Sequence, residues 1–290
     1  MRLAALSIGA GAPAGDFAGT IAAVYARVCA LSLADENLIT LVTPTVGSLP
    51  RSITLDTQLE FSFADFLAVG ATVAARSGIL RIEGSALSID LRTAIHWRSC
   101  ISNLRLDGSR EPVMHALEAA RAVLRQDGRS NALARIADER LAALEATTRT
   151  LNAAAAGDAL SGLVGLGEGA TPAGDDYLVG YFAGLWACAG GIPARAAFIA
   201  NLRQLLKSSA LDAGRISRIY LEAVADGEVS ERLSDLARCI ATGSDRISVE
   251  RTAAAVIAVG HSSGACALLG FLQACAFWNY AAPADGHERR

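Results

Sequence analysis

The chain has 290 residues, which is enough for one large domain or two of modest size. Hydrophobic residues make up 52% of it and charged residues 19%, a composition that excludes an intrinsically disordered protein. The net charge is −3 and Lys and Arg form no block, which argues against nucleic acid as a partner because its phosphates require clustered positive charge.

The chain ends and the cysteines indicate a cytoplasmic protein without a membrane segment. The apolar core of "MRLAALSIGAGAPAG" is too short and too interrupted by glycine for a signal peptide. The uncharged stretch Thr252–Pro283 is long enough to span a membrane, but it contains His261 and several glycines, which favours a buried helix. The six cysteines form no Cys-x-x-Cys motif, as is typical of buried free thiols: Cys29, Cys100, Cys188, Cys239, Cys266 and Cys275.

The first hundred residues are predicted to form mainly strands. Leu38–Pro44 and Ser52–Asp56 are short and rich in β-branched residues. Ile79–Leu91 alternates apolar and polar residues on both sides of Gly84-Ser85, which suits a two-residue hairpin turn. The stretch between these segments, from Gln58 to Gly78, has no clear pattern.

From Pro112 onward the periodicity becomes helical. Pro112 suits a first helical position and Gly128 a helix end. A second helix is predicted over Asn131–Ala156, closed by Gly157. A nearly wholly apolar helix is predicted from about Asp175, and further helices near Ala194–Ser208, Arg215–Ala225, Ser230–Thr242 and Ala253–Tyr280, the last broken around Gly260–Gly264.

This order of elements predicts an α+β fold, in which a β-rich N-terminal part precedes a mainly helical C-terminal part with a central buried helix. The β-rich region is expected over residues 1–110 and the helical region over residues 111–290. Whether the β-rich region is a separate domain stays open at this point.

A glycine-rich loop, "GLGEGATPAGDD" (Gly165–Asp176), leads into the central helix. Thr171 suits an N-cap and Pro172 a first helical residue, which would put Asp175 and Asp176 in the first turn, where the helix dipole favours negative charge. Stabilisation of a helix start is therefore one interpretation of the aspartates. It does not explain the glycines, which permit positive φ or a close approach of the backbone: Gly165, Gly167, Gly169 and Gly174.

The helix that follows has apolar residues on every side, so it must be buried all round. Gly180 and Gly184 are four positions apart, which allows another backbone to pack closely against this side of the helix. The aspartate pair is therefore expected at the floor of a cleft or at an interface.

Two later segments share features with this loop. In "VGHSSGACALLG" (Val259–Gly270), small residues again precede an uncharged helix, and Ser262 and Ser263 can cap it beside His261. Such a helix start can bind an anion, although ordinary capping and a core histidine are the alternatives. In "DAGRISRIYLEA", Arg215 or Arg218 could bind phosphate or carboxylate, unless both lie on a solvated helix face.

No cofactor follows with certainty from these motifs. Asp175 and Asp176 could hold Mg²⁺ through water, with a substrate phosphate completing the shell. The glycine loop lacks the Lys-Ser/Thr pair of a P-loop, and the chain has neither a Gly-x-Ser-x-Gly nor a His-Glu-x-x-His motif.

The stretch "GLGEGATPAGDDYLVGYFAG" resembles the signature Gly-x-Gly-x-Gly-Leu-Thr-Pro-Ser-Gly-Asp-Asp-Phe-Leu-x-Gly of a bacterial family that includes the AllH-type subunit of oxamate carbamoyltransferase. "AIHWRS" (Ala94–Ser99), "RIS" (Arg215–Ser217) and "GHSSG" (Gly260–Gly264) resemble other segments of this family, in the same order. The chain departs from the signature at three positions, Ala170, Ala173 and Tyr177, and Ala173 replaces a serine hydroxyl.

The resemblance implies a carbamoyltransferase subunit of purine and allantoin breakdown that works with larger partner subunits. The complex would convert oxalurate and phosphate to oxamate and carbamoyl phosphate. On this hypothesis the loop N–H groups and nearby hydroxyls bind the small anionic substrate: Gly167, Gly169, Thr171, Gly174, Ser217, Ser262 and Ser263.

In the same hypothesis, Asp175 and Asp176 bind a metal or orient an amide, and His261 and Arg215 stabilise the charge that develops on the transferred group. The alternatives are a non-catalytic scaffold and a small-molecule-binding subunit. A pocket bounded by both glycine loops would favour binding or catalysis, whereas loops sealed inside the core would favour the scaffold.

Overall fold

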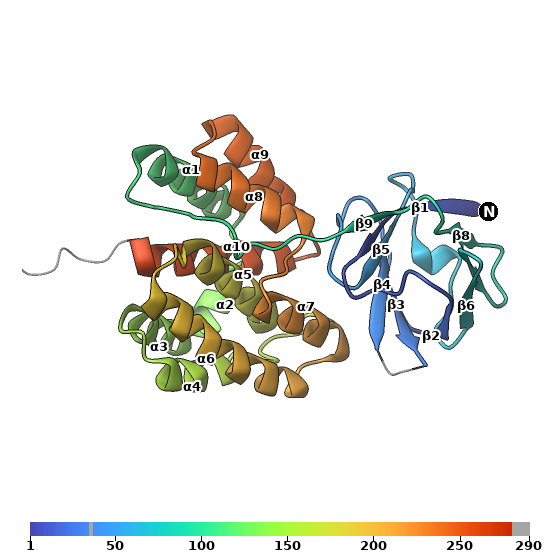
Figure 1. Cartoon of the computed structure of the whole chain (residues 1–290), viewed down its shortest axis with the longest axis horizontal. Coiled ribbons are helices and arrows are strands. Elements are labelled where there is room, and N and C mark those ends of the chain that lie inside the picture. The colour runs from blue at the N-terminus through green and yellow to red at the C-terminus, as the bar shows by residue number, and fades with distance from the viewer. Residues whose placement is uncertain (35–36, 280–290) are drawn as a thin grey trace, which may run out of the picture. The chain divides into compact units, whose positions relative to one another are not determined.

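The computed structural model describes residues 1–34 and 37–279, without the side chains of Ala132, Ala134 and Asn279 (Figure 1). The chain divides into two compact units. The first comprises Met1–Cys100 and Glu228–Arg232, and the second comprises Ile101–Gly227 and Leu233–Arg290. The first unit contains the strands and the second is helical, so the predicted α+β class is confirmed. The β-rich region was predicted over residues 1–110. The division between the two units falls after Cys100.

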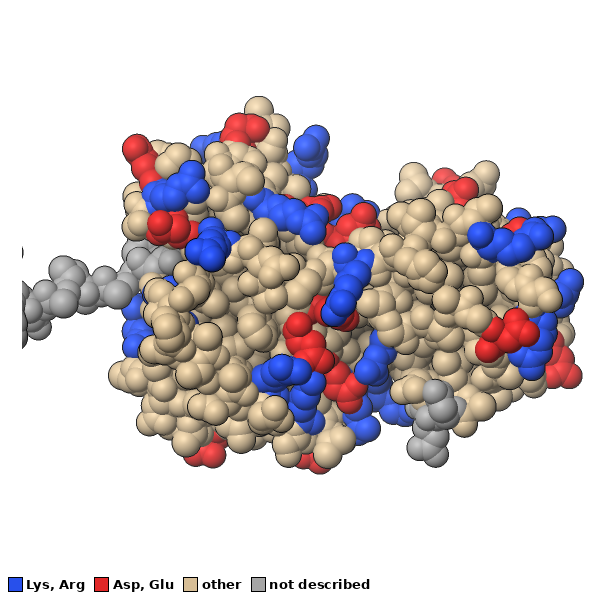
Figure 2. Space-filling model, in the orientation of Figure 1, with Lys and Arg blue, Asp and Glu red and all other residues tan. Residues whose placement is uncertain are grey.

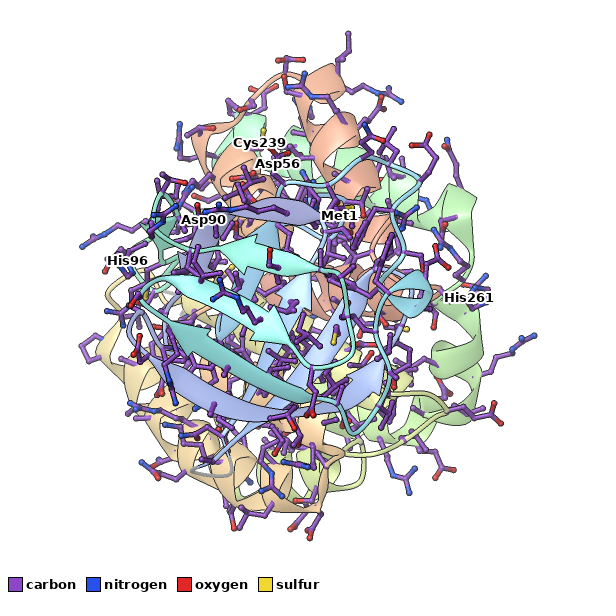
Figure 3. All side chains as sticks on the ribbon, turned by 90° about the vertical axis from the view of Figure 1, so that its right-hand side faces the viewer. Met1, Asp56, Asp90, His96, Cys239 and His261 are labelled. Carbon is purple, nitrogen blue, oxygen red and sulfur yellow. The ribbon has the colours of Figure 1, made fainter. Side chains whose placement is uncertain are left out.

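The strands of the first unit close into a ring (Figure 3). Their order is β5-β4-β3-β2-β6-β7-β8-β1, β1 also pairs with β5, and β9 pairs in parallel with the end of β1. Closure leaves few free strand edges, which are otherwise liable to pair with other chains. The strands are β1 (Arg2–Gly9), β2 (Phe17–Val24), β3 (Val28–Leu33), β4 (Leu38–Val42), β5 (Ser52–Leu55), β6 (Thr72–Arg76), β7 (Ile79–Ile82), β8 (Ser88–Asp90) and β9 (Ile95–Trp97).

The strand predictions from β-branched residues are confirmed. Every residue of β4 and β5 is buried, including the polar residues Thr40, Ser52 and Thr54. β7 and β8 form the predicted antiparallel hairpin, and Gly84 has a φ of +71°. The connection covers residues 83–87, so it is longer than the predicted two-residue turn.

A segment from far along the chain completes the first unit. The carboxylate of Glu231 accepts a hydrogen bond of 2.8 Å from the Ser48 backbone N–H, and the Glu231 N–H donates to the Ser48 carbonyl at 2.9 Å. Arg232 donates to the carbonyl of Pro44 at 2.8 Å, and Glu228 pairs with Arg98 at 2.8 Å. Residues 228–232 therefore satisfy backbone groups of the loop between β4 and β5 that would otherwise be buried unpaired.

The second unit consists of helices. They are α1 (Glu111–Asp127), α2 (Asn131–Ile136), α3 (Asp138–Arg149), α4 (Ala153–Ser161), α5 (Ala173–Cys188), α6 (Pro193–Ser209), α7 (Arg215–Ala225), α8 (Glu231–Thr242), α9 (Arg246–Ile257) and α10 (Ser263–Asn279). The first residues of α8 count with the sheet. Short 3₁₀ turns occupy Phe63–Asp65 in the first unit and Ala210–Asp212 in the second.

The structure corrects several predicted helix boundaries. α1 ends at Gly128 as predicted, with a φ of +72°. The single helix predicted over Asn131–Ala156 is wrong, because Leu151 has a φ of +55° and Asn152 caps a new helix by accepting from the Ala155 N–H at 3.3 Å. Gly157 consequently lies inside α4. α9 begins at Arg246, well before the predicted Ala253, and the predicted end at Tyr280 lies outside the described residues.

The predicted central buried helix is α5. Its side chains Tyr177, Tyr181 and Phe182 are fully buried. The Tyr177 hydroxyl donates to Gln273 of α10 at 2.7 Å, and the Tyr181 hydroxyl lies 2.6 Å from that of Thr148 in α3. Each buried hydroxyl thus has a hydrogen-bonding partner, as a core position requires.

Glycines let α5 and α10 touch through their backbones. A Cβ added at Gly180 would overlap the carbonyl oxygen of Ala267, and one at Gly184 would lie 2.6 Å from that of Phe271. The contact at Gly180 is with Ala267, and the contact one turn later, at Gly184, is with Phe271, one turn further along α10. The two helices are therefore parallel. The predicted close packing at Gly180 and Gly184 is confirmed.

None of the helices within the described ranges is long and apolar enough to cross a membrane. All six cysteines are free, as predicted, although Cys100 and Cys239 are partly exposed. Positive and negative side chains are interspersed on the face shown in Figure 2, in agreement with the absence of a basic block.

Candidate functional site

The starts of α5 and α10 lie side by side. The Thr171 hydroxyl, just before α5, is 3.1 Å from the hydroxyl of Ser263, the first residue of α10. Both hydroxyls also hydrogen-bond with the side chain of Asp176. Thr171 does not cap α5 as predicted, since Pro172 occupies the N-cap position and no side chain caps the helix there. The hydroxyl instead joins the two glycine loops.

The start of α7 lies at the same end. A Cβ at Gly214, just before α7, would be 3.8 Å from the carbonyl oxygen of Ala170 in the glycine loop. Further along, the indole N–H of Trp186 in α5 donates to the carbonyl of Val224 in α7 at 3.0 Å. α7 is therefore parallel to α5. Three helices begin together, so the partial positive charges of their N-termini add and favour negative charge at this place.

Asp175 is 1% exposed and fastens the glycine loop to α5. Its Oδ1 accepts a hydrogen bond of 2.7 Å from the Gly165 N–H. Its Oδ2 is buried without a hydrogen-bonding partner among the described residues. A buried carboxylate oxygen left in this way costs free energy, typically about 1–3 kcal/mol, unless another group supplies a donor.

Asp176 faces α10, and burial raises its pKa from 3.8 to about 7. The charge of Asp175 raises the pKa further, while the hydroxyls of Ser263 and Thr171 oppose this by stabilising the ionised form. The Oδ2 of Asp176 likewise has no partner within the described part of the chain. Burial and the nearby Asp176 together raise the pKa of the Cys266 thiol to about 12, which makes that thiol a poor nucleophile. The pKa of about 7 places the titration of the Asp176 carboxyl group near neutral pH.

The glycines of the loop allow it to lie on the first turn of α5. Gly167 has a φ of +114°, and a Cβ there would be 2.9 Å from the backbone nitrogen of Ala173. Gly169 has a φ of +99° and also requires the left-handed region. The Gly174 N–H donates to the carbonyl of Leu166 at 2.8 Å. The close approach predicted from these glycines thus occurs against α5 itself.

His261 and Arg215, predicted as charge-stabilising residues, both have exposed side chains near these helix starts. Figure 3 shows His261 at the margin of the molecule, so the alternative of a core histidine is wrong. Arg215 is the first residue of α7. Ser262 accepts the Cys266 N–H through its carbonyl at 2.9 Å, as a residue at a helix start does.

Ser217 lies in the first turn of α7 and is 1% exposed. Its hydroxyl has no partner among the residues described. Arg129 is a further residue at these helix starts and was not predicted. It pairs with Asp127 at 2.7 Å and donates to the carbonyls of His261 at 2.7 Å and Ile257 at 3.2 Å. Arg129 thereby holds the turn that leads into α10, and nothing in its own segment signals that long-range role.

A metal at Asp175 and Asp176 stays a prediction. Within residues 1–34 and 37–279, no three His, Cys, Asp or Glu side chains gather as a metal site. The two unpartnered carboxylate oxygens would suit Mg²⁺, which commonly uses one or two carboxylates and completes its shell with water and substrate phosphate.

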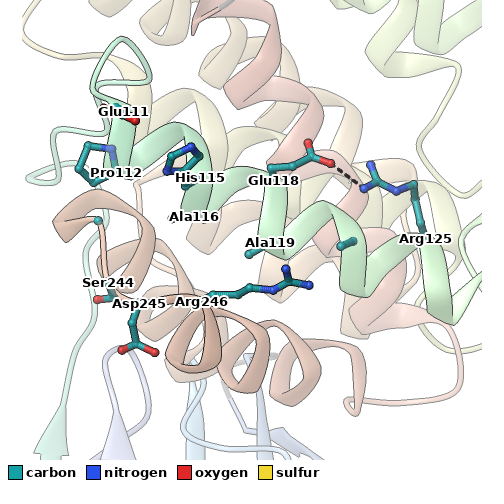
Figure 4. Close-up of a pocket in the computed structure, with 12 residues that line it drawn as sticks. Glu111, Pro112, His115, Ala116, Glu118, Ala119, Arg125, Ser244, Asp245 and Arg246 are labelled. Carbon is teal, nitrogen blue, oxygen red and sulfur yellow. Dashed lines mark hydrogen bonds and ion pairs between the residues drawn. The ribbon is translucent and has the colours of Figure 1, made fainter.

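A groove of about 730 Å³ lies elsewhere in the helical unit, between α1 and the turn into α9 (Figure 4). Ala116 and Ala119 lie along it, and Glu118 pairs with Arg125 at 2.6 Å on its rim. None of its lining residues comes from either glycine loop. The groove is therefore separate from the three helix starts.

Two family models match the chain. The model described as "AllH family N-terminal domain" matches residues 4–96, and that described as "Oxamate carbamoyltransferase subunit AllH" matches residues 163–275. No curated protein and no solved structure matches the chain. The second match begins just before the glycine loop that leads into α5 and ends inside α10, so it includes the starts of α5, α7 and α10.

Proposed function

Because the chain belongs to the AllH family of oxamate carbamoyltransferase subunits, we propose that it is the anion-binding subunit of a cytoplasmic carbamoyltransferase-like complex. Membership of a subunit family implies larger partner subunits. The reaction implied by the family moves a carbamoyl group between the oxamate nitrogen and a phosphate oxygen. Every reactant in it is a small anion, and a subunit that handles them needs localised positive potential.

The observation that carries the proposal is the common origin of α5, α7 and α10. The Thr171–Ser263 contact and the approach of Gly214 to Ala170 bring the three helix starts together. Phosphate or carboxylate bound there would accept from backbone N–H groups and nearby hydroxyls. Arg215, at the first position of α7, supplies the cation that offsets repulsion between the anion and the aspartates.

We assign proton transfer to Asp176. When oxalurate reacts with hydrogen phosphate, the C–N bond to the carbamoyl carbon breaks and a C–O bond to phosphate forms. The proton of hydrogen phosphate ends on the oxamate nitrogen, so a group is needed that can accept and release it. A carboxyl group with a pKa of about 7 is suited to that exchange at neutral pH.

Co-purification of the chain with partners encoded beside it, followed by a phosphate-dependent assay on oxalurate, tests this function. We expect Arg215→Ala to lower kcat/KM at least about tenfold, since a charge-assisted hydrogen bond contributes roughly 1.5–3 kcal/mol. Arg251→Ala, which removes an exposed arginine of α9, is the matched control and should have no effect. Absence of turnover with any partner, or full activity of both Arg215→Ala and His261→Ala, would remove the catalytic assignment.

A non-catalytic structural subunit is the second candidate. It is favoured by the burial of Asp175 and by the packing of the glycine loop on α5. Hydrogen exchange of residues 165–171 in the full chain separates the two functions. Protection of this loop by millimolar phosphate or oxamate supports binding, whereas exchange unaffected by either anion supports the structural role.

A further inference from the structure

Asp175 and Ser217 lie in the first turns of two parallel helices that begin close together. Asp175 precedes Trp186 by about three helical turns, so both are on the same side of α5. That side faces α7, because Trp186 bonds to Val224. Ser217 is buried in the first turn of α7, about two turns before Val224. Both residues belong to the first turns of their helices, at the candidate anion site.

Each of the two side chains has a buried oxygen atom without a hydrogen-bonding partner among the described residues. Each residue is 1% exposed, and the Oδ2 of Asp175 and the Oγ of Ser217 have no partner in the described chain. An ionised carboxylate oxygen can only accept, so the missing group is a donor. A primary amide offers two N–H donors, and its carbonyl can accept from a serine hydroxyl.

We propose, building on the function proposed above, that Asp175 and Ser217 bind the amide group of a small amide-bearing carboxylate such as oxamate. The carboxylate of the same ligand would lie toward the N-termini of α5, α7 and α10. The pair then makes the site selective, because the isosteric dicarboxylate, oxalate, places a second negative charge against the buried Asp175. Like charges at short range are strongly disfavoured where water is excluded.

Entry of the ligand requires movement of the glycine loop. Residues 165, 167, 168 and 169 of this loop are exposed, and the Gly165 N–H bond to Asp175 Oδ1 holds the loop over the carboxylate. Opening of the loop breaks this one bond to the carboxylate, and the bond can form again over the bound ligand. Opening and reclosing of loop 165–171 on binding is therefore part of the proposal.

Calorimetric titration of the full chain with oxamate and with oxalate provides the test. The wild-type protein should bind oxamate at least about tenfold more tightly than oxalate, equivalent to roughly 1.4 kcal/mol. In Asp175→Asn, the side-chain oxygen can still accept from Gly165, while an NH₂ group replaces Oδ2 and donates. This variant should bind oxalate at least as tightly as oxamate. Asp158→Asn, at an exposed position of α4, is the control and should keep the wild-type preference.

The outcomes separate this inference from the function on which it rests. If neither anion binds to the wild-type chain, the proposed anion-binding function fails and the inference fails with it. If both anions bind but Asp175→Asn keeps the wild-type preference, only the inference is overturned. Should Asp175→Asn not fold, Ser217→Ala replaces it, and an affinity for oxamate that stays within twofold of wild type would overturn the inference.

Discussion

Gly180→Ala is expected to lower the free energy of unfolding by at least about 3 kcal/mol, at the upper end of the cost of overpacking a core. The added Cβ would overlap the carbonyl oxygen of Ala267, which belongs to the α10 backbone and cannot rotate away. The two buried helices would have to separate along their whole contact. Since native domains are stable by only about 5–15 kcal/mol, this one methyl group removes a large share of the total.

Urea denaturation of the purified chain measures this effect, with Gly157→Ala as a matched control. Gly157 is also buried inside a helix, but a Cβ there would meet the flexible side chain of Leu205 at 2.5 Å. The leucine can move aside, and alanine favours the helix by about 1 kcal/mol relative to glycine. We expect the control to remain within about 1 kcal/mol of wild type. Equal stability of the two variants would mean that α5 and α10 do not touch through their backbones.

Asp176→Asn is expected to make the protein more stable than wild type in alkaline solution. The pKa of Asp176 is raised in the folded chain, so between about pH 4 and pH 7 the folded state holds a proton that the unfolded state has released. Stability from this group is complete below pH 4 and is lost as the pH rises through 7. The change from 3.8 to about 7 corresponds to at most about 4 kcal/mol.

Urea denaturation at pH 5.5 and pH 8 tests this prediction. The wild-type chain should lose about 2 kcal/mol over this interval relative to Asp176→Asn, whose side chain does not titrate. The exposed Asp158 provides a control, because Asp158→Asn should follow the wild-type dependence. If the stability difference between wild type and Asp176→Asn is the same at both values of pH, the carboxyl group of Asp176 titrates in its ordinary range.

Sequence patterns within one segment predicted the burial and the close packing of α5. The lack of charge after Asp176 identified α5 as a buried helix, and the spacing of Gly180 and Gly184 identified its close packing. The break at Leu151 was missed because the apolar periodicity of α3 continues into α4. The left-handed conformation there has no glycine to signal it.

The assembly of the candidate site was less predictable. The sequence indicated that the loops before α5 and α10 share a character, but the parallel course of α7 depends on distant contacts such as Trp186 with Val224. The burial of Ser217 and the hold of Arg129 on the turn at His261 depend on the same kind of contact. Such long-range contacts cannot be predicted from the periodicity of one sequence, because each residue fits the pattern of its own helix whether or not the contact forms.

The return of residues 228–232 to the sheet affects how genes of this family can recombine. A chimera that joins residues 1–100 of one member to the remainder of another would place a foreign pentapeptide against the backbone at Ser48 and beside Arg98. A folded sheet therefore requires that residues 1–100 and the pentapeptide match each other. An exchange of the N-terminal half should preserve a folded sheet only when the pentapeptide is transferred with it.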